Sequence, residues 1–219
     1  MATNNDFENA LNIMKTVPKG TTLLLHSCCA PCSSACLELL SRYFDITVLY
    51  YNPNIEDVAE YEKRKAEQIR LLNETGWGRI IDCDHSHEDF TSIVKGYEHC
   101  PEKGERCRRC YELRMRKTAL TAKEKGFDYF STTLSVSPYK ISRWINEIGC
   151  ELEKETGVRF LPSDFKKQGG YQRSIELSRE YGLYRQNFCG CKYSKTAEEK
   201  KKDDIIYSET EANTDKPEN

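Results

Sequence analysis

Short apolar runs alternate along this chain with longer segments in which apolar residues recur every three or four positions. The short runs, mostly bounded by Gly, Pro or Asp, predict strands at residues 22–26, 46–51, 79–82, 129–134 and 158–161. The longer segments predict helices at residues 33–43, 57–75, 105–125, 140–156 and 170–181. Because strands and helices alternate, the pattern predicts βαβ units and an α/β fold, with a parallel sheet covered by helices.

The helix over residues 140–156 has the clearest periodicity, because its apolar residues fall on a single stripe. This stripe consists of Ile141, Trp144, Ile145, Ile148 and Leu152. Gly76, Gly126 and Gly157 each follow a predicted helix, where a glycine commonly forms the C-terminal cap.

A length of 219 residues suits one α/β domain, which we place at residues 20–194. Residues 1–19 are expected to form an N-terminal extension with a helix, and the charged residues 195–219 are expected to be disordered. No apolar run approaches the roughly 20 residues that span a bilayer, and the N-terminus lacks the pattern of a signal peptide. The sequence therefore predicts a cytoplasmic protein without a membrane partner.

Charge is unevenly distributed, although the net charge of −2 names no partner. Residues 103–125 contain nine Lys or Arg against three Glu, a local net charge of +6. A basic helix of this kind suits an anionic polymer such as a nucleic acid, and a solvated helix face would give the same pattern.

Eleven cysteines are unusual for a cytoplasmic chain, where metal ligation or redox chemistry is their common use. The first group, Cys28, Cys29 and Cys32, directly follows the first predicted strand and precedes a helix expected to begin at Ser33 or Ser34. A nucleotide-binding protein of similar fold would place a phosphate loop there. The positive end of the helix should favour thiolates or a negatively charged thiolate-bound cluster.

Two further groups contain Cys107 with Cys110, and Cys189 with Cys191. A C-x-x-C turn is a common half-site for zinc or an iron–sulfur cluster. Cysteines one residue apart would close a strained disulfide ring, so the last pair suits redox exchange or a second metal. The four remaining cysteines are expected to be ordinary buried or surface thiols: Cys36, Cys83, Cys100 and Cys150. Metal ligation through Cys32 and Cys36 together stays an alternative.

Four motifs, at residues 26–36 (HSCCAPCSSAC), 107–115 (CRRCYELRM), 130–140 (FSTTLSVSPYK) and 165–191, resemble those of the non-cobalamin epoxyqueuosine reductase family. The resemblance covers about residues 20–194. It implies a Rossmann-like sheet related to the adenine-nucleotide hydrolase-like superfamily, with thiols in place of the phosphate loop. It also implies the two-electron reduction of epoxyqueuosine in tRNA to queuosine, in which the epoxide oxygen leaves as water.

The resemblance assigns roles to the cysteines. Residues Cys28, Cys29, Cys107 and Cys110 match the positions that hold a 4Fe–4S cluster, and Cys189 and Cys191 match a redox-active pair that can also help to hold an additional iron ion. Many relatives carry Asp where this chain has Cys32, a catalytic candidate. Either its thiolate replaces the carboxylate as an iron ligand or the role of the second metal is altered, and we favour the first because it keeps a negatively charged ligand. His26 is a candidate proton donor or hydrogen-bond donor to a cluster sulfur, and an ordinary strand-end histidine is an equal alternative.

The expected tRNA surface lies around the basic helix and the Gly-Gly turn. Phosphate contacts are expected from five residues of the basic helix: Arg108, Arg109, Arg114, Arg116 and Lys117. Three further residues are expected to extend this surface: Lys166, Lys167 and Arg173. Gly169 and Gly170 would permit close approach of the backbone, and Tyr139 would bind or stack on the substrate, unless it is a packing residue. The expected partners are the anticodon loop that bears epoxyqueuosine and an electron donor that the sequence does not identify.

Three alternatives remain at this point. The first is a zinc-stabilised module that binds tRNA or protein without redox chemistry. The second is an adenylating tRNA-modifying enzyme, which would need a phosphate loop where this chain has Cys-Cys-Ala-Pro. The third is a thiol–disulfide oxidoreductase that uses Cys189 and Cys191 alone and leaves the other cysteines unexplained.

Overall fold

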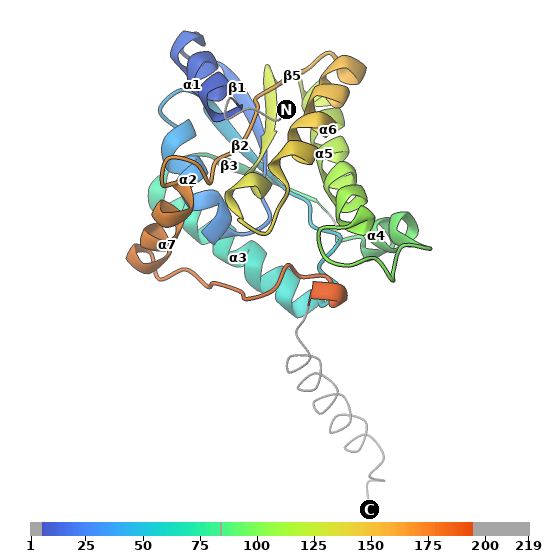
Figure 1. Ribbon diagram of the computed structural model, residues 1–219. Helices are drawn as coiled ribbons and strands as arrows, with labels where there is room; N and C mark the ends of the chain where they lie inside the picture. Colours follow the sequence, from blue (N-terminus) through green and yellow to red (C-terminus); the bar gives the residue numbers. More distant parts are fainter. Residues whose placement is uncertain (1–5, 84, 195–219) are drawn as a thin grey trace, which may run out of the picture.

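A parallel five-stranded sheet forms the centre of the protein, as the computed structural model shows for residues 6–83 and 85–194 (Figure 1). The strand order is β3-β2-β1-β4-β5, and every neighbouring pair is parallel. The strands are β1 (Thr22–His26), β2 (Asp45–Tyr50), β3 (Arg79–Asp82), β4 (Tyr129–Thr132) and β5 (Arg159–Phe160). The predicted α/β fold with a parallel sheet is confirmed.

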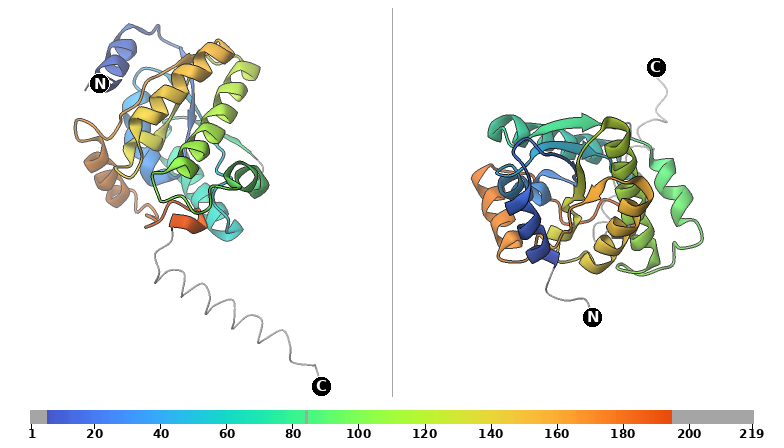
Figure 2. Two further views of the ribbon diagram at one scale, coloured as in Figure 1. Left: turned by 45° about the vertical axis from the view of Figure 1, so that its right-hand side comes forward. Right: turned by 90° about the horizontal axis from the view of Figure 1, so that it is seen from above.

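Helices cover both faces of the sheet (Figure 2). One layer contains α1 (Asp6–Thr16), α2 (Ala30–Leu40), α3 (Val58–Thr75) and α7 (Gly170–Glu180), and the other contains α5 (Glu105–Lys125) and α6 (Ser142–Thr156). The short helix α4 (His87–Val94) packs against α5. Two separate apolar cores result, because alternate side chains of a strand point to opposite faces: Leu23 and Leu25 enter one core and Leu24 the other.

Local sequence features explain where the helices begin and end. The carboxylate of Asp57 accepts hydrogen bonds from the backbone N–H groups of the first turn of α3, which satisfies donors that have no partner within the helix. Gly76, Gly126 and Gly157 adopt left-handed conformations with φ of 66°, 72° and 79°, and each caps the helix before it. The predicted glycine caps are therefore confirmed.

The clearest differences from the prediction concern α2, β4 and α4. Helix α2 begins at Ala30 rather than at Ser33 or Ser34, because Cys29 is its extended N-cap and Pro31 fits the first turn. Strand β4 ends at Thr132, whose hydroxyl accepts a hydrogen bond from the N–H of Leu134 and starts the 3₁₀ helix η1 (Thr133–Val136). Helix α4 was not predicted. The domain boundaries and the relation to the nucleotide hydrolase-like superfamily stay predictions, and the tail from residue 195 lies outside the described residues.

The strand order reverses between β1 and β4, and this point of the sheet is a typical ligand-binding position. Strands β1 and β4 are neighbours, and the chain leaves β1 toward α2 on one face and β4 toward the opposite layer. In open α/β sheets, ligands bind beyond the carboxyl ends of the strands at such a reversal of strand order. Cys28 directly follows β1 at this point. No helix in the described ranges combines the length and the apolar composition needed to cross a membrane.

Candidate thiol and metal site

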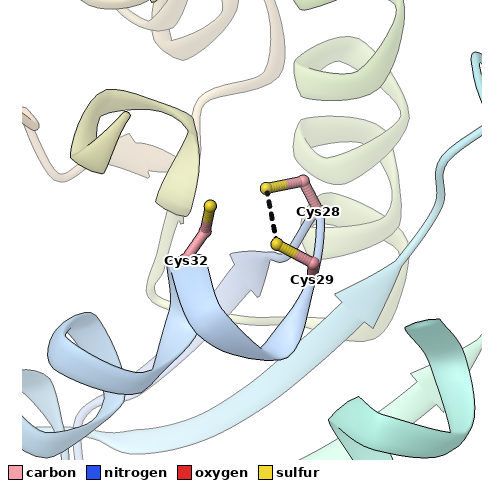
Figure 3. Close-up of side chains that lie close together, drawn as sticks. All are labelled: Cys28, Cys29 and Cys32. Atoms are coloured by element: carbon pink, nitrogen blue, oxygen red, sulfur yellow. Dashed lines mark hydrogen bonds between the residues drawn. The ribbon is translucent and has the colours of Figure 1, made fainter. Parts of the chain in front are cut away.

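Three cysteine sulfurs meet at the carboxyl end of β1. The Sγ atoms of Cys28, Cys29 and Cys32 all lie within 4.8 Å of one another, and those of Cys28 and Cys29 are 3.8 Å apart (Figure 3). The extended backbone of Cys29 lets its side chain approach that of Cys28, and Cys32 lies in the first turn of α2 on the same side. The group therefore sits at the positive end of a helix, where negative charge is stabilised.

The three thiols share protons unequally. Hydrogen bonds from the Cys29 and Cys32 thiols, together with the nearby guanidinium of Arg114, hold the pKa of Cys28 well below its usual value. The same hydrogen bonding with Cys28 raises the pKa of Cys29 and of Cys32 above their ordinary range. The arrangement therefore favours negative charge at Cys28 over Cys29 and Cys32.

A cavity of about 500 Å³ opens beside this group. Cys28 and Cys32 form one wall, and the segments 136–140 and 185–189 form two others. Two basic residues in its wall, Arg64 and Arg114, are only 2% and 1% exposed. A concave site with buried polar groups at a switch point of the sheet is the expected location of a ligand.

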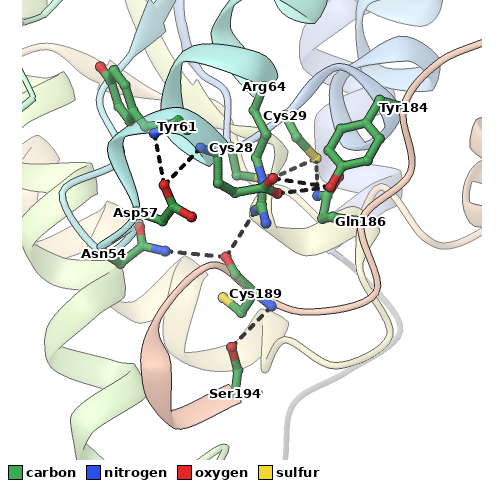
Figure 4. A network of polar contacts seen from close by, with 12 residues as sticks. Cys28, Cys29, Asn54, Asp57, Tyr61, Arg64, Tyr184, Gln186, Cys189 and Ser194 are labelled. Atoms are coloured by element: carbon green, nitrogen blue, oxygen red, sulfur yellow. Dashed lines mark hydrogen bonds and ion pairs between the residues drawn. The ribbon is translucent and has the colours of Figure 1, made fainter. Parts of the chain in front are cut away.

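The segment around Cys189 is fixed against this cavity by side chains from three other parts of the chain (Figure 4). The Nε2 of Gln186 donates to the Sγ of Cys29 at 2.8 Å. The carbonyl oxygen of Cys189 accepts hydrogen bonds from Asn54 Nδ2 and from Arg64 Nη1, both at 3.3 Å. Its N–H donates to the Oγ of Ser194 at 3.1 Å. The first and third cysteine groups therefore lie on the same cavity.

The second cysteine group lies in the first two turns of α5, the helix that also carries Arg114. Cys110 is 6% exposed and packs in a small cluster with Cys191. Arg114 follows Cys110 by one helical turn. Burial lowers the pKa of its guanidinium, but the electrostatic effect of Cys110, Cys189 and Cys28 outweighs burial and raises this pKa. One cysteine of each group therefore acts electrostatically on this arginine. Within the part of the chain that the structure describes, however, Cys107 and Cys110 do not join the compact group of three sulfurs.

The expected phosphate contact of Arg114 is wrong, because this side chain is buried. Its Nε donates to the carbonyl oxygen of Cys110 at 3.2 Å, and its Nη2 has no hydrogen-bond partner among the described residues. A signal was present in the sequence, since Arg114 follows Cys107 and Cys110 by seven and four residues and so shares their helix face.

His26 is fully buried and both of its ring nitrogens are engaged. The Nε2 of His26 lies 3.1 Å from the carbonyl oxygen of Tyr51, which can only accept a hydrogen bond, so Nε2 carries the proton and donates. The Nδ1 then accepts a hydrogen bond from the Thr132 hydroxyl at 3.0 Å. Burial, followed by the charge of Arg114, lowers the pKa of His26 to about 3. In this arrangement His26 is a neutral strand-end residue, and it forms no hydrogen bond to a cysteine sulfur.

Most of the predicted tRNA-binding side chains have partners within the protein. Arg109 lies over the ring of Tyr97, Arg116 binds Glu155 and Glu112, Arg173 binds Glu38, and Lys166 binds Asp164. Lys117 and Lys167 are exposed, and Arg108 is half-buried. Tyr139, with 63% of its surface exposed, stands at the edge of the cavity. Whether these residues contact substrate stays a prediction.

The Gly-Gly turn has a structural reason within the chain itself. Gly169 has a φ of 81°, and a Cβ on Gly170 would lie 1.9 Å from the carbonyl oxygen of Phe165. The fold alone therefore requires glycine at position 170, and its presence is no sign of close substrate approach.

Sequence reasoning missed Arg64, Lys140 and Gln186, which line this cavity, and Asn54, which donates to the carbonyl oxygen of Cys189. Lys140 and Gln186 lie inside or beside motifs with recognisable cysteines, which was an available signal. Asn54 and Arg64 belong to a segment without such a motif, and only the packing of α3 brings them here. No disulfide joins any of the eleven cysteines, all of which lie within the described ranges.

Comparison with known proteins agrees with the sequence motifs. Residues 23–197 match the family model described as epoxyqueuosine reductase QueH. A protein of that name from Streptococcus pyogenes is 43% identical over 178 residues, which cover 79% of this chain and 70% of the relative. A relative of the same name from Staphylococcus aureus is 41% identical, and the match covers 78% of this chain and 75% of the relative. One from Thermotoga maritima is 38% identical, and the match covers 79% of this chain and 90% of the relative.

Proposed function

Because the chain belongs to the epoxyqueuosine reductase QueH family, we propose that it converts epoxyqueuosine in tRNA to queuosine by removing the epoxide oxygen as water. It is therefore an enzyme, an oxidoreductase of tRNA modification. The observation that carries the proposal is the group of three thiols at the switch point of the sheet, beside a cavity that the third cysteine group also borders. An ordinary nucleotide-binding sheet has a phosphate loop at this position.

The cysteines fit an iron–sulfur cluster by the chemistry of their donor atoms. Thiolates are the ligands that such clusters require, and the N-terminus of α2 with the unpaired Nη2 of Arg114 would offset the negative charge of the site. We propose that Cys28, Cys29, Cys107 and Cys110 hold a 4Fe–4S cluster, and that Cys32 is available to an additional iron ion. When bound, these groups would supply single electrons and a Lewis acid for the epoxide oxygen.

The remaining residues would bind the substrate and supply reducing equivalents. Removal of an epoxide oxygen consumes two electrons and two protons and yields an alkene and water. Oxidation of the Cys189 and Cys191 thiols to a disulfide releases two electrons and two protons, so the two half-reactions balance. An electron donor outside this chain would then reduce the disulfide.

Substrate access would follow the open side of the cavity. A modified base within a tRNA loop must leave its stack to reach a recessed site, and aromatic side chains commonly support the displaced base. Tyr139 stands exposed at the cavity edge with the Nζ of Lys103 5.8 Å from its ring centre. Arg108 and Lys167 would extend the contact to tRNA phosphates.

Replacement of one proposed ligand tests this function. The substitution Cys107→Ser should remove the visible cluster absorbance together with the conversion of epoxyqueuosine, measured by nucleoside analysis of digested tRNA. The matched control is Cys150→Ser, because Cys150 is exposed on α6 and should affect neither property. A Cys107→Ser protein that keeps both would refute the ligand role, and a colourless wild-type protein that contains zinc would favour a structural metal site.

A further inference from the structure

The two cysteines of the Cys-Gly-Cys turn lie in different surroundings. Cys189 borders the cavity, and within the described part of the chain Cys191 does not. Cys191 is 8% exposed and packs against Phe90, Val94 and Cys110. A substrate in the cavity would therefore meet one sulfur of the pair and not the other.

Lys140 marks the sulfur that borders the cavity. Its Nζ donates to the Sγ of Cys189 at 2.8 Å. Burial lowers the pKa of this ammonium, but the negative charge of Cys189 outweighs burial and raises the pKa above its usual value. The nearby guanidinium of Arg114 acts in the opposite direction and lowers the pKa of Lys140. Lys140 is half-buried in the cavity wall, and the Sγ of Cys189 is the hydrogen-bond acceptor that this geometry provides for its ammonium group, which favours the thiolate.

The backbone of the turn prevents the two sulfurs from exchanging places. The carbonyl oxygen of Cys189 accepts hydrogen bonds from Asn54 and Arg64, and the N–H of Cys189 donates to the hydroxyl of Ser194. Gly190 has a φ of 108°, and a Cβ there would lie 2.8 Å from the side chain of Ile55. The turn therefore fits closely against α3 and the loop before it, in one orientation.

We propose that Lys140 is a positioning residue that fixes Cys189 as the cavity-facing thiolate of the pair and leaves Cys191 as the buried thiol that closes the disulfide. In the step, the Cys189 thiolate and the Cys191 thiol form one sulfur–sulfur bond and release two electrons and one proton. The second proton for the departing water comes from solvent. The inference rests on the proposed function, because it assigns separate roles within that redox pair.

Selective alkylation of the reduced protein tests the assignment. The full chain is treated with iodoacetamide without oxygen, and the modification of each cysteine is followed by peptide fragmentation. Wild-type Cys189 should react at least about tenfold faster than Cys191, because thiolate character and access both favour it. Lys140→Met should reduce this ratio to about threefold or less, and Lys140→Arg, which keeps the charge, should largely restore it.

A reduction potential provides the second readout. In thiol–disulfide buffers, Lys140→Met should make the pair easier to oxidise, because the cation stabilises the reduced thiolate. The matched control is Lys103→Met, which removes a cation at the cavity edge that lies over Tyr139 and does not touch the pair. A potential that moves equally in both variants would contradict a role specific to Lys140.

The outcomes separate this inference from the proposed function. Alkylation is measured without tRNA, so a protein that fails to reduce epoxyqueuosine can still show the predicted order of the two sulfurs. Faster reaction of Cys191 in the wild type, or an unchanged ratio in Lys140→Met, would overturn the assignment. If the Met variant does not fold, Lys140→Gln, which keeps a neutral hydrogen-bond donor, is measured in its place, and the same two results decide.

Discussion

Two arginines on α5, separated by one residue, show the difference between the cavity and the outer surface of this protein. Arg116 is 40% exposed, and its guanidinium binds Glu155 at 2.6 Å and Glu112 at 3.2 Å. Arg114 is 1% exposed, and the groups that raise the pKa of its guanidinium are chiefly cysteines from three separate segments. One cation is neutralised by nearby carboxylates, and the other faces sulfur.

This difference changes the meaning of the basic helix. The excess of Lys and Arg in residues 103–125 suggested an anionic partner, yet Arg109 and Arg116 already form ion pairs, and Arg114 lies inside the protein. Exposed ion pairs contribute little to stability or to binding. A buried cation without a carboxylate partner has a larger effect, because its charge is poorly screened there.

The largest effect is expected at Arg114. In Arg114→Met, iron affinity measured by competition with a chelator should fall about 10- to 100-fold, the cost typical of residues that support metal ligands. The thermal stability of the metal-free protein should change little, because a buried and incompletely bonded charge is removed. Arg116→Met is the matched control and should keep wild-type iron affinity. Equal iron affinities in the two variants would erase the distinction between the arginines.

A smaller effect is expected for tRNA binding by Arg108. This residue is half-buried, and within the described ranges no carboxylate forms an ion pair with it, unlike Arg109 and Arg116, so its charge is not already neutralised. Arg108→Ala should weaken tRNA binding about three- to tenfold and reduce the salt dependence by about one phosphate contact. Arg116→Ala, measured in parallel, should have a weaker effect because Arg116 is already paired. If Arg116→Ala loses more tRNA affinity than Arg108→Ala, ion pairs within the protein do not predict which side chains contact tRNA.

The smallest effect is expected at Arg173 on α7, which binds Glu38 at 2.6 Å and lies near two other glutamates. The side chain is 40% exposed, so solvent screens these pairs. Arg173→Met should lower the free energy of unfolding by at most about 1 kcal/mol and leave tRNA affinity unchanged. Denaturant unfolding and a binding titration check the two parts. A clear loss of tRNA affinity would return Arg173 to the interface.

The fold was predictable where one local feature determines an element. Strands β1 and β3 and helix α5 have the predicted bounds, because Gly and Asp residues mark their ends and their apolar residues follow a clear pattern. Helix α2 begins earlier than predicted because Pro31 is a good residue for a first helical turn, a signal that was present but not used. Helix α4 is only one short amphipathic segment, preceded by a polar run around His85, and the pattern alone did not reveal it.

The site was predictable in its cysteines and much less so in its other polar groups. Cysteine spacing marked Cys28, Cys29 and Cys32, and their closeness follows from the strand-to-helix turn. The positions of Arg64 and Lys140 depend on how α3 and the segment after η1 pack beside the turn at Cys189. These are contacts between residues 49 to 125 positions apart, which local pattern cannot specify.

The metal and sulfide content of protein purified without oxygen tests the central claim most directly. If the cysteines hold a 4Fe–4S cluster, each chain should contain about four acid-labile sulfides with about four irons, or about five when the additional iron is bound, and Cys28→Ser should lose most of both. About one zinc per chain without sulfide would contradict an iron–sulfur site and leave the three thiols as ligands of a structural metal.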